Sequence, residues 1–367
     1  MKIGILTHYA VYNMGAQLQL SSMIHYLEEL GHQAVVLTYE KNFDYLEGEK
    51  EKNSASLKAL PYYFKHYLLE KGPGLTYFNY RKVSALQAGM KRRSYAPYLE
   101  HDCDAIVIGS DEVFSIDVGC NRMMYGHGIE RYPKIAYAPS FGRTTIEDLK
   151  RCGCYELVQS GLSRMEHLSA RDVHTQEMLR TLTGREAPLT CDPVLLYDGH
   201  GFQNSHSAIS GDYMVIYAYD SHMIDPAEVS ALKAYAKKHR LKTVSLGTYH
   251  SWCDKNVVSD AESWYHLFAG AKCVVTDTFH GCVVAMKNHC NVAVFIRESI
   301  NAFKLRSLLE ETGMTGRRLE AITEAELDRV LSTPIDYAVT DARIASMAEQ
   351  SGAYLRGALA QIQARSL

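Results

Sequence analysis

The stretch Ala271-Lys-Cys-Val-Val-Thr-Asp-Thr-Phe-His-Gly-Cys-Val-Val-Ala-Met-Lys-Asn-His-Cys-Asn-Val-Ala-Val-Phe295 decides the fold. Its apolar run 273–275 predicts a buried strand, the polar residues 276–278 a loop, the next apolar segment a short helix, and 292–295 a second strand. This order is that of a βαβ unit, whose crossover is right-handed. The loop after the first strand therefore lies at the carboxyl edge of a sheet, where open α/β proteins bind ligands.

His280 is the candidate catalytic residue of this stretch, because it lies where the loop meets the N-terminus of the predicted helix. Unpaired N–H groups at a helix N-terminus favour an anion, and an imidazole beside an anion is suited to acid–base chemistry. For most lone histidines, however, a capping or core role is the better explanation. The residue alone therefore leaves both interpretations open.

Composition indicates an ordinary two-domain protein. The 367 residues, 47% of them hydrophobic, can bury two cores, and a net charge of −3 gives no sign of a nucleic-acid partner. The nine cysteines are scattered, with no C-x-x-C and only a Cys152-Gly-Cys154 pair that is too tight for a zinc knuckle. We expect reduced thiols and no metal site. With no signal peptide and no apolar run of membrane-spanning length, we also expect a soluble cytoplasmic protein.

The first half of the chain reads as alternating strands and helices. Strands are predicted at 2–7, 33–38, 104–111 and 134–142, a helix at 146–163, and a short strand at 167–171. The first loop lacks G-x-G-x-x-G, so the dinucleotide fingerprint is absent. Asn13, Gly15 and Gln17 cluster where this loop meets its helix, which is a ligand-facing position, although a loop shaped only for packing explains them equally well.

Two charged residues follow predicted strands of this half. Asp111 ends the strand that begins at 104 and could orient a hydroxyl or a base, or simply cap the next segment. Arg171 ends the short strand and could bind a carboxylate or phosphate through its planar fork. An ion pair with Asp172 is the structural alternative for Arg171.

A second α/β pattern begins after a Gly-, Ser-, His- and Asn-rich linker at 198–211. It comprises strands at 213–218 and 242–246, helices at 226–239, 261–270 and 301–312, a loop at 247–260, and a last helical segment at 322–365. We therefore predict two doubly wound Rossmann-like domains facing a cleft, at 1–197 and 211–335. The helix of 336–367 is predicted to pack back on the N-terminal domain.

The segment 41–100 is an irregular helical insert in the first domain, with helices predicted at 57–70 and 76–92. The second helix ends in Lys91-Arg92-Arg93 and carries several aromatic side chains. A basic, aromatic helix can rest on an anionic membrane surface, which predicts a peripheral membrane contact. A solvated helix face is the commoner explanation of such a run of charges.

Seven segments carry a resemblance to a known family. They are Asn13-Met-Gly-Ala-Gln-Leu-Gln19, Asp104-Ala-Ile-Val-Ile-Gly-Ser-Asp-Glu-Val-Phe114, Tyr137-Ala-Pro-Ser-Phe-Gly142, Ser169-Ala-Arg-Asp172, Cys191-Asp-Pro-Val-Leu-Leu196, Val275-Thr-Asp-Thr-Phe-His-Gly281 and Arg306-Ser-Leu-Leu-Glu-Glu-Thr-Gly313. In this order they resemble the polysaccharide pyruvyl transferases. The resemblance implies a GT-B-like fold and transfer of the carboxyvinyl unit of phosphoenolpyruvate to a sugar diol, giving a pyruvate ketal and phosphate.

The resemblance also implies the partners and the roles of particular residues. The acceptor is a cell-surface polysaccharide or its lipid-linked precursor at the cytoplasmic membrane face, and phosphoenolpyruvate is a co-substrate, with no other cofactor. The implied catalytic residues are His280 and Asp111. The implied donor-binding residues are Arg171, Thr278, Gly281, Arg297 and Arg306, and the acceptor-binding residues are His8, Asn13, Gly15, Gln17 and Ser140.

The chain departs from the family pattern at two places. Thr278 stands where some members have an arginine, so another cation must bind the donor if that arginine normally does so. Gly109-Ser-Asp-Glu-Val-Phe-Ser115 replaces the Gly-Ser-Asp-Gln-Val-Trp-Asn of many relatives. Two rival functions remain at this point. One is a GT-B glycosyltransferase using a nucleotide sugar, although no clear glutamate pair follows the late strand; the other is a non-catalytic carbohydrate-binding protein.

Overall fold

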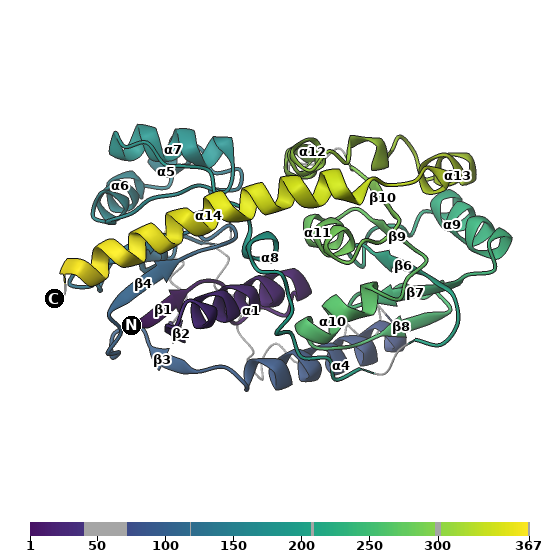
Figure 1. The fold of residues 1–367 in the computed structure, drawn as a ribbon, viewed down its shortest axis with the longest axis horizontal. Helices are drawn as coiled ribbons and strands as arrows, with labels where there is room; N and C mark the ends of the chain where they lie inside the picture. Colours follow the sequence, from purple (N-terminus) through teal and green to yellow (C-terminus); the bar gives the residue numbers. More distant parts are fainter. Residues whose placement is uncertain (40–71, 118, 207–208, 298–301, 366–367) are drawn as a thin grey trace.

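The computed structural model describes residues 1–39, 72–117, 119–206, 209–297 and 302–365. Two parallel sheets, each with helices on its faces, lie side by side, and a long C-terminal helix crosses both (Figure 1). The prediction of two Rossmann-like α/β domains is confirmed. The predicted helix 57–70 lies outside the described residues.

The first domain contains a five-stranded sheet in the order β3-β2-β1-β4-β5. Its strands are β1 (Lys2–Leu6), β2 (Gln33–Thr38), β3 (Tyr95–Pro97), β4 (Ala105–Ile108) and β5 (Lys134–Ala136), all paired in parallel. The associated helices are α1 (Met14–Glu29), α4 (Gly72–Met90), η3 (Arg122–Tyr125), α5 (Ile146–Arg151), α6 (Tyr155–Ser163), α7 (Val173–Thr183) and α8 (Pro193–Leu196). Every residue of β4 is buried, as expected for a central parallel strand covered on both faces.

The second domain contains a six-stranded parallel sheet in the order β11-β10-β9-β6-β7-β8. Its strands are β6 (Tyr213–Tyr217), β7 (Lys242–Leu246), β8 (Lys255–Val257), β9 (Cys273–Thr276), β10 (Val292–Phe295) and β11 (Arg318–Leu319). Its helices are α9 (Pro226–Lys238), α10 (Ala261–Phe268), α11 (Phe279–Lys287), α12 (Ala302–Glu311), η4 (Thr315–Arg317), α13 (Glu324–Ser332) and α14 (Tyr337–Arg365). The βαβ unit predicted from 271–295 is β9-α11-β10.

Four predicted elements differ from the structure. The short strand predicted at 167–171 is only a pair of isolated bridges, at His167 and Ala170. The predicted helix 146–163 is two helices, because Gly153 adopts a left-handed φ of 67° between α5 and α6. The predicted segment 322–365 is likewise broken into α13 and α14, with Pro334 in the break, where its missing N–H and fixed φ interrupt a helix. The predicted loop 247–260 contains the short strand β8, whose three residues are too few to show a period.

Helix α14 joins the two domains (Figure 1). Near its start, Arg343 donates to the carbonyl oxygen of Glu310 in the second domain at 3.0 Å. Towards its end, the Tyr354 hydroxyl donates to the carbonyl oxygen of Ala136 in the first sheet at 3.0 Å. One buried apolar cluster contains residues of both sheets together with α1, α8, α10, α11 and α14. The domains therefore share a core, which fixes the facing edges of the two sheets relative to each other.

The strand orders place two ligand-binding crevices face to face. In each sheet the order reverses at its first strand, between β1 and β4 in one domain and between β6 and β9 in the other. Open α/β sheets bind ligands beyond the carboxyl ends of strands at such a switch point. The loops that leave β1, β4, β6 and β9 carry His8, Asp111, Tyr219 and Thr278. A site at the domain boundary follows from this topology.

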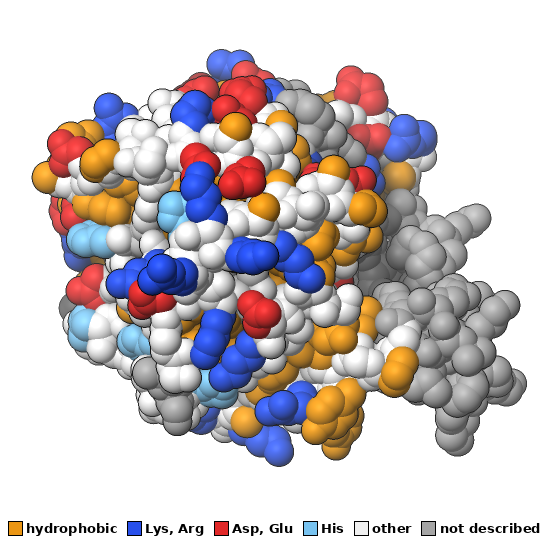
Figure 2. All heavy atoms as spheres, turned by 90° about the vertical axis from the view of Figure 1, so that its right-hand side faces the viewer, with side chains coloured by type: hydrophobic (Ala, Val, Ile, Leu, Met, Phe, Trp, Pro, Cys, Tyr) orange, Lys and Arg blue, Asp and Glu red, His pale blue; other side chains and the backbone are white. Residues whose placement is uncertain are grey.

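The predicted basic helix is α4. Two of the basic residues that follow it, Arg92 and Arg93, make contacts within the protein. Arg93 donates to the carbonyl oxygen of Gln17 at 3.0 Å, and Arg92 forms an ion pair with Asp260 at 3.4 Å. Tyr77 and Tyr80 are exposed. On the outer face of the second domain, Lys and Arg side chains are spread with Asp and Glu among them (Figure 2). Within the described ranges, no helix combines the length and apolarity needed to cross a membrane.

Candidate functional site

A small polar cavity of about 120 Å³ lies where the N-termini of α1 and α11 meet. Asn13 and Met14 line it from α1, Thr278 and His280 from α11, and Lys82 from α4. Asn13 and Thr278 are the N-caps of these helices, accepting from the N–H groups of Ala16 and Gly281 at 3.1 and 3.0 Å. Two helix N-termini and a lysine therefore surround one cavity, an arrangement that favours an anion.

Lys82 is the cation of this cavity. Burial lowers the pKa of its ammonium group, and the carboxylate of Asp220, which also lines the cavity, opposes that shift. Among the described residues, no hydrogen bond or ion pair of its Nζ atom is formed. A buried ammonium group that forms no ion pair gains from an anionic ligand, because such a ligand supplies the charge pairing that it lacks.

His280 lies at the second position of α11, with its side chain 15% exposed. Its Nε2 atom is 3.5 Å from Oδ2 of Asp192, and in the described part of the chain this buried nitrogen has no hydrogen bond of acceptable geometry. The Nδ1 side of the ring faces Gly15, where an added β-carbon would lie 2.2 Å from Nδ1. The imidazole is thus held between two elements of the first domain, with Nε2 turned towards Asp192 and Nδ1 towards Gly15.

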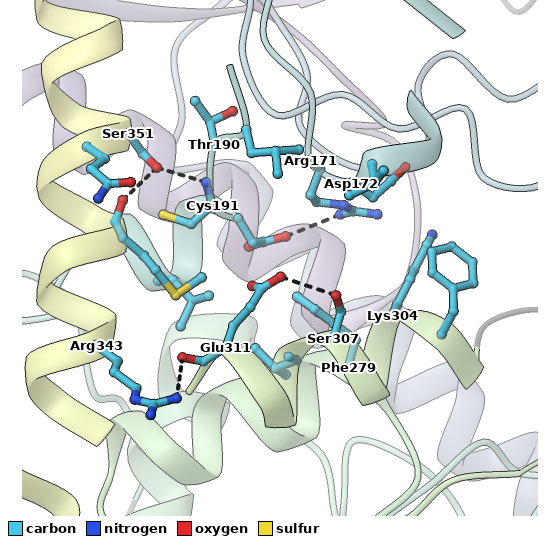
Figure 3. Close-up of a pocket in the computed structure, with 18 of the residues that line it drawn as sticks. Arg171, Asp172, Thr190, Cys191, Phe279, Lys304, Ser307, Glu311, Arg343 and Ser351 are labelled. Carbon is cyan, nitrogen blue, oxygen red and sulfur yellow. Dashed lines mark hydrogen bonds and ion pairs between the residues drawn. The ribbon is translucent and has the colours of Figure 1, made fainter. Parts of the chain in front are cut away.

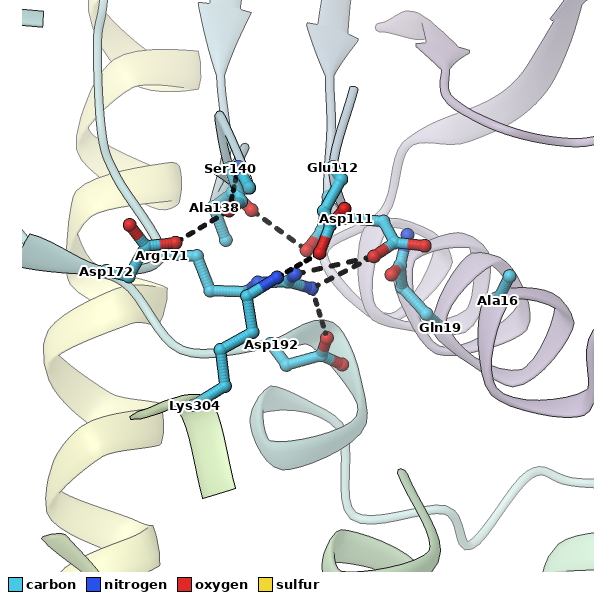
Figure 4. A network of polar contacts seen from close by, with 12 residues as sticks. Ala16, Gln19, Asp111, Glu112, Ala138, Ser140, Arg171, Asp172, Asp192 and Lys304 are labelled. Carbon is cyan, nitrogen blue, oxygen red and sulfur yellow. Dashed lines mark hydrogen bonds and ion pairs between the residues drawn. The ribbon is translucent and has the colours of Figure 1, made fainter. Parts of the chain in front are cut away.

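Arg171 occupies the centre of a charged cluster at the same boundary (Figure 4). Its guanidinium lies 3.4 Å from Oδ1 of Asp111 and 3.3 Å from Oδ2 of Asp192. Burial alone would lower the pKa of Arg171, but these two carboxylates raise it, so the group stays charged. Both distances exceed the 2.7–2.9 Å that is usual for charge-assisted hydrogen bonds. Arg171 can therefore exchange these partners for a better-placed anion.

The two carboxylates of the cluster are kept ionised. Burial alone would raise the pKa of Asp111, but the attraction of Arg171, His8 and His280 outweighs it and lowers that pKa to about 2. Burial would also raise the pKa of Asp192, yet His280 and Arg171 lower it. Asp192 can therefore orient an imidazole and stabilise positive charge on it, as the carboxylate of a catalytic triad does.

An ion pair closes the boundary beside this cluster. Lys304, on α12 of the second domain, pairs with Glu112 of the first domain, and Figure 4 shows its side chain reaching past Arg171. Asp111 and Glu112 are consecutive residues, so Arg171 and Lys304 bring two cations to one short loop. This pairing couples the position of α12 to the loop that follows β4.

A second, larger cavity of about 530 Å³ lies on the other side of Arg171 (Figure 3). It is enclosed by α7, α12, α14 and the segment around Cys191. Phe279, which precedes His280, lines both cavities. The cluster of Arg171, Asp192 and His280 therefore forms the wall between a small polar cavity and a large one.

Comparison with known families identifies the family to which the chain belongs. The family model for polysaccharide pyruvyl transferase matches residues 13–299, which include both sides of the boundary and every residue of the cluster. The chain belongs to the polysaccharide pyruvyl transferase family. It is accordingly a transferase that acts on polysaccharide, and the resemblance seen in the sequence motifs is confirmed. None of the curated proteins matches the sequence.

This family member has the GT-B type of fold, and a glycosyltransferase structure with a TM-score above 0.5 supports this. UGT89C1 of Arabidopsis thaliana, solved with quercetin, is similar with a TM-score of 0.51 at 12% identity, over 100% of this chain and 99% of that one. The UDP-GlcNAc 2-epimerase of Neisseria meningitidis, bound to UDP-GlcNAc, is similar with a TM-score of 0.48 at 11% identity, over 98% and 100% of the two chains. At such identities the likeness concerns the fold alone.

The structure brings together most of the residues that the sequence predicted for this pyruvyl transferase site. His280, Asp111 and Arg171 lie in or beside the cluster, and His8 is near enough to Asp111 to lower its pKa. Asn13 and Thr278 line the small cavity, and Gly15 packs on His280. Gly281 leaves no space for a side chain, since an added β-carbon would lie 2.3 Å from Oγ1 of Thr276.

Other predicted residues lie away from the cavities or have protein partners. Gln17 donates to the carbonyl oxygens of Tyr9 and Val11 at 2.8 Å, which holds the first loop. Ser140 donates to Oδ2 of Asp172 at 2.7 Å and is fully buried. Arg297 bridges Asp277 and Glu228 with contacts of 2.8 to 3.1 Å. Arg306 lies half-buried on α12, two residues after Lys304. Ser140 lies beside the cluster, since its N–H donates to the carbonyl oxygen of Asp111 at 2.8 Å (Figure 4). The structure does not bring the other three residues to the cluster.

Sequence reasoning missed Asp192, Lys304, Glu112 and Lys82. Asp192 belongs to a quoted motif and precedes a proline, a pattern that predicts only its cap on α8, whose Val194 N–H it accepts at 3.0 Å. Lys82 is one of several charges on a helix whose pattern is typical of a solvated or membrane-facing surface. The contribution of these four residues to the site can be seen only in the three-dimensional arrangement of the two domains. In the described part of the chain, no cluster of three or more His, Cys, Asp or Glu residues could hold a metal ion.

Proposed function

We propose that this transferase moves the carboxyvinyl unit of phosphoenolpyruvate onto two hydroxyl groups of a sugar, giving a pyruvate ketal and inorganic phosphate. The sugar belongs to a cell-surface polysaccharide or its lipid-linked precursor. The observation that carries the proposal is the position of His280. The ring lines the small cavity together with Lys82, and its buried Nε2 lies beside Asp192, which lines the larger cavity that can admit an acceptor.

Ketal formation from an enol phosphate requires an acid, a base and fixed cations. A proton is added to the methylene carbon, and positive charge develops on the carbon that carries the phosphate. A sugar hydroxyl attacks this carbon and loses its proton, the C–O bond to phosphate breaks, and a second hydroxyl closes the ring with loss of another proton. Histidine is the side chain best suited to give and take protons near neutral pH.

Each step has a candidate residue in the cluster. Protonated His280 delivers the proton to the methylene carbon, and the neutral ring then accepts the proton of the attacking hydroxyl. Asp192 orients the imidazole and stabilises its charged form. The phosphate and carboxylate of the donor are bound by Lys82, by the N-termini of α1 and α11, and by Arg171 after it exchanges its carboxylate partners.

Lys82 also accounts for a departure from the family pattern. Thr278, which replaces an arginine found in some members, lines the same small cavity as Lys82. The threonine side chain caps α11, and the lysine of α4 supplies the cation. We therefore assign to Lys82 the donor-binding charge that position 278 does not provide.

The experiment for this proposal measures phosphate release with phosphoenolpyruvate and a panel of galactosides and N-acetylhexosaminides, together with product mass. Acceptor-dependent phosphate and a product heavier by one pyruvate less one water are the expected results. Absence of release with every acceptor, combined with a rise in Tm on adding a nucleotide sugar, would replace the proposal by glycosyl transfer.

We further propose a cytoplasmic location with peripheral membrane contact through the exposed side of α4. Tyr77 and Tyr80 are exposed there, and Arg81 lies over the ring of Tyr77 at 6.0 Å. Aromatic and basic side chains on one helix suit the headgroup region of an anionic bilayer. The wild-type protein should float with anionic vesicles, and the double variant Tyr77→Ser, Tyr80→Ser should float less. A wild-type protein that stays in the soluble fraction would contradict the contact.

A further inference from the structure

The larger cavity has the dimensions and chemistry of a ligand site. Its volume of about 530 Å³ falls within the roughly 300–1,000 Å³ that small-molecule pockets usually have. Arg171 and Asp192 line one part of it, so it opens onto the same cluster as the small cavity. Figure 3 shows Arg171 and Lys304 on one side of the space, with Arg343 and Ser351 of α14 on the other.

Many of the polar side chains around this cavity are already bonded to the protein. Ser351 accepts from the N–H of Cys191 at 2.8 Å and donates to the carbonyl oxygen of Met347 at 2.7 Å. Arg343 donates to the carbonyl oxygen of Glu310, at the end of α12. Ser307 donates to Glu311 at 3.2 Å. Away from the Arg171 cluster, these walls offer a ligand few free polar groups and mainly apolar contact.

The apolar lining includes both buried and exposed side chains. Leu195 and Leu308 are buried in the walls. Val173, Leu189 and Phe303 are exposed by 56%, 45% and 39%, which is unusual for large hydrophobic side chains in this protein. Clustered exposed apolar groups around a concavity mark a binding surface, because water is displaced from them when a ligand binds.

The pKa of Glu311 reflects the apolar surroundings of the larger cavity. Its carboxyl group faces the cavity from α12, and burial raises its pKa. The neighbouring Glu310 raises the pKa further, while the hydrogen bond from Ser307 lowers it. A carboxyl group that resists ionisation beside apolar walls favours an uncharged ligand segment at this position.

We propose that the larger cavity binds an apolar chain attached to the acceptor sugar, so that the acceptor is an amphiphilic glycoside. The sugar end lies at Arg171 and Asp192, and the chain lies between α12 and α14 in contact with Leu189, Leu308 and Phe303. Because it assumes a sugar acceptor, this proposal rests on the proposed function. The charged cluster at one part of the cavity and the apolar walls elsewhere match the two ends of such a molecule.

The test measures binding without phosphoenolpyruvate, so that it does not depend on turnover. Methyl, butyl and octyl β-galactosides are titrated into the full-length protein by calorimetry, below the concentration at which the octyl compound forms micelles. Full burial of each added methylene should tighten binding by up to about fourfold. Equal affinity for the three glycosides, or binding of 1-octanol as tight as that of octyl galactoside, would overturn the proposal.

Variants locate the chain in this cavity. Leu189→Ser and Phe303→Ser change exposed side chains and should reduce the gain from methyl to octyl at least fivefold, whereas Ile224→Ser, which changes an exposed side chain outside both cavities, should leave the gain unchanged. Ser346→Trp, on the exposed side of α14, should block the cavity and abolish the gain. A gain that survives all three cavity variants contradicts the proposal.

The two proposals can fail separately. Chain-length-dependent binding without phosphate release from phosphoenolpyruvate would retain the apolar site and reject the reaction. Phosphate release with every sugar, independent of chain length in both binding and KM, would retain the reaction and reject the apolar site.

Discussion

Gly15 and His280 lie in contact across the domain boundary: a β-carbon at position 15 would be 2.2 Å from Nδ1 of the imidazole. Gly15 is in the first turn of α1, and His280 is in the first turn of α11. The absence of a side chain on one helix therefore sets the position of the ring on the other. Gly15 has no side chain that could take part in the reaction. This contact nevertheless makes a glycine at position 15 important for function.

Substitution Gly15→Ala should displace the imidazole and reduce kcat by about 10- to 100-fold, since misplacement by about 1 Å can cost this much. The added methyl group cannot be accommodated without moving the ring or separating the domains. The matched control is Gly357→Ala, because Gly357 is also helical but has open space around its Cα. Steady-state kinetics on both variants make the comparison; equal activity of the two would contradict the positioning role.

Substitution His280→Asn should reduce turnover by about 10²- to 10⁴-fold while leaving the affinity for phosphoenolpyruvate nearly unchanged, because it removes the proton carrier but not the cations. The control is His289→Asn, in a second histidine–carboxylate pair, His289–Asp341 at 3.0 Å, outside both cavities. Calorimetry gives the affinity and phosphate release gives the rate. Undiminished turnover in the His280 variant would reject the catalytic assignment.

Substitution Lys82→Met should raise the KM for phosphoenolpyruvate by about 10- to 100-fold, because loss of one charge-assisted contact removes roughly 1.5–3 kcal/mol of binding. The neighbouring Arg81 is exposed and lies outside the small cavity, so Arg81→Met is the control and should have little effect. A larger effect at Arg81 than at Lys82 would show that α4 contributes through general charge rather than through the cavity.

Asp111 should make stability depend on pH at the acidic end. Its pKa is lowered to about 2 in the folded protein, from an ordinary value near 3.9. Its ionised form therefore contributes stability that is fully present above pH 4 and is lost as the pH falls through about 2. The Tm difference between wild type and Asp111→Asn should be largest above pH 4 and shrink below it.

The control for this pH dependence is Asp212→Asn, which changes an exposed carboxylate paired only loosely with Lys272 at 3.6 Å. Its Tm difference from wild type should be small and nearly constant over the same range. A difference for Asp111→Asn that grows as the pH falls would contradict the ion pairing described for Arg171.

Much of the fold could be predicted from the sequence, because apolar runs indicate buried parallel strands and capping residues indicate where helices begin and end. Strands β2 and β7 have the predicted bounds, and Asp225 with Pro226 correctly predicted the start of α9. The turn at Gly153 and the break at Pro334 cannot be seen in the apolar pattern, because that pattern continues on both sides of each. In both places a local backbone requirement outweighed the periodicity.

The site could be predicted only in part. His280 and Asp111 each follow a strand, and Arg171 follows the isolated bridge at Ala170, so topology alone brings them to a carboxyl edge. Asp192 lies at the start of a four-residue helix, and Lys82 lies within a helix of the insert; neither follows a strand. Asp192 reaches the site because α1, α8 and α11 pack together across the boundary, and Lys82 because α4 brings it to the small cavity. Neither tertiary contact can be seen in the periodicity of a single sequence.

The most direct test of the central claim is the mass of the product formed in D2O from phosphoenolpyruvate and an accepted sugar. If His280 delivers a solvent-derived proton to the methylene carbon, the product is heavier than the sugar by one pyruvate less one water and carries one deuterium in its methyl group. The His280→Asn variant should form almost none of it. A ketal without deuterium, or an undiminished yield from the variant, would contradict the mechanism.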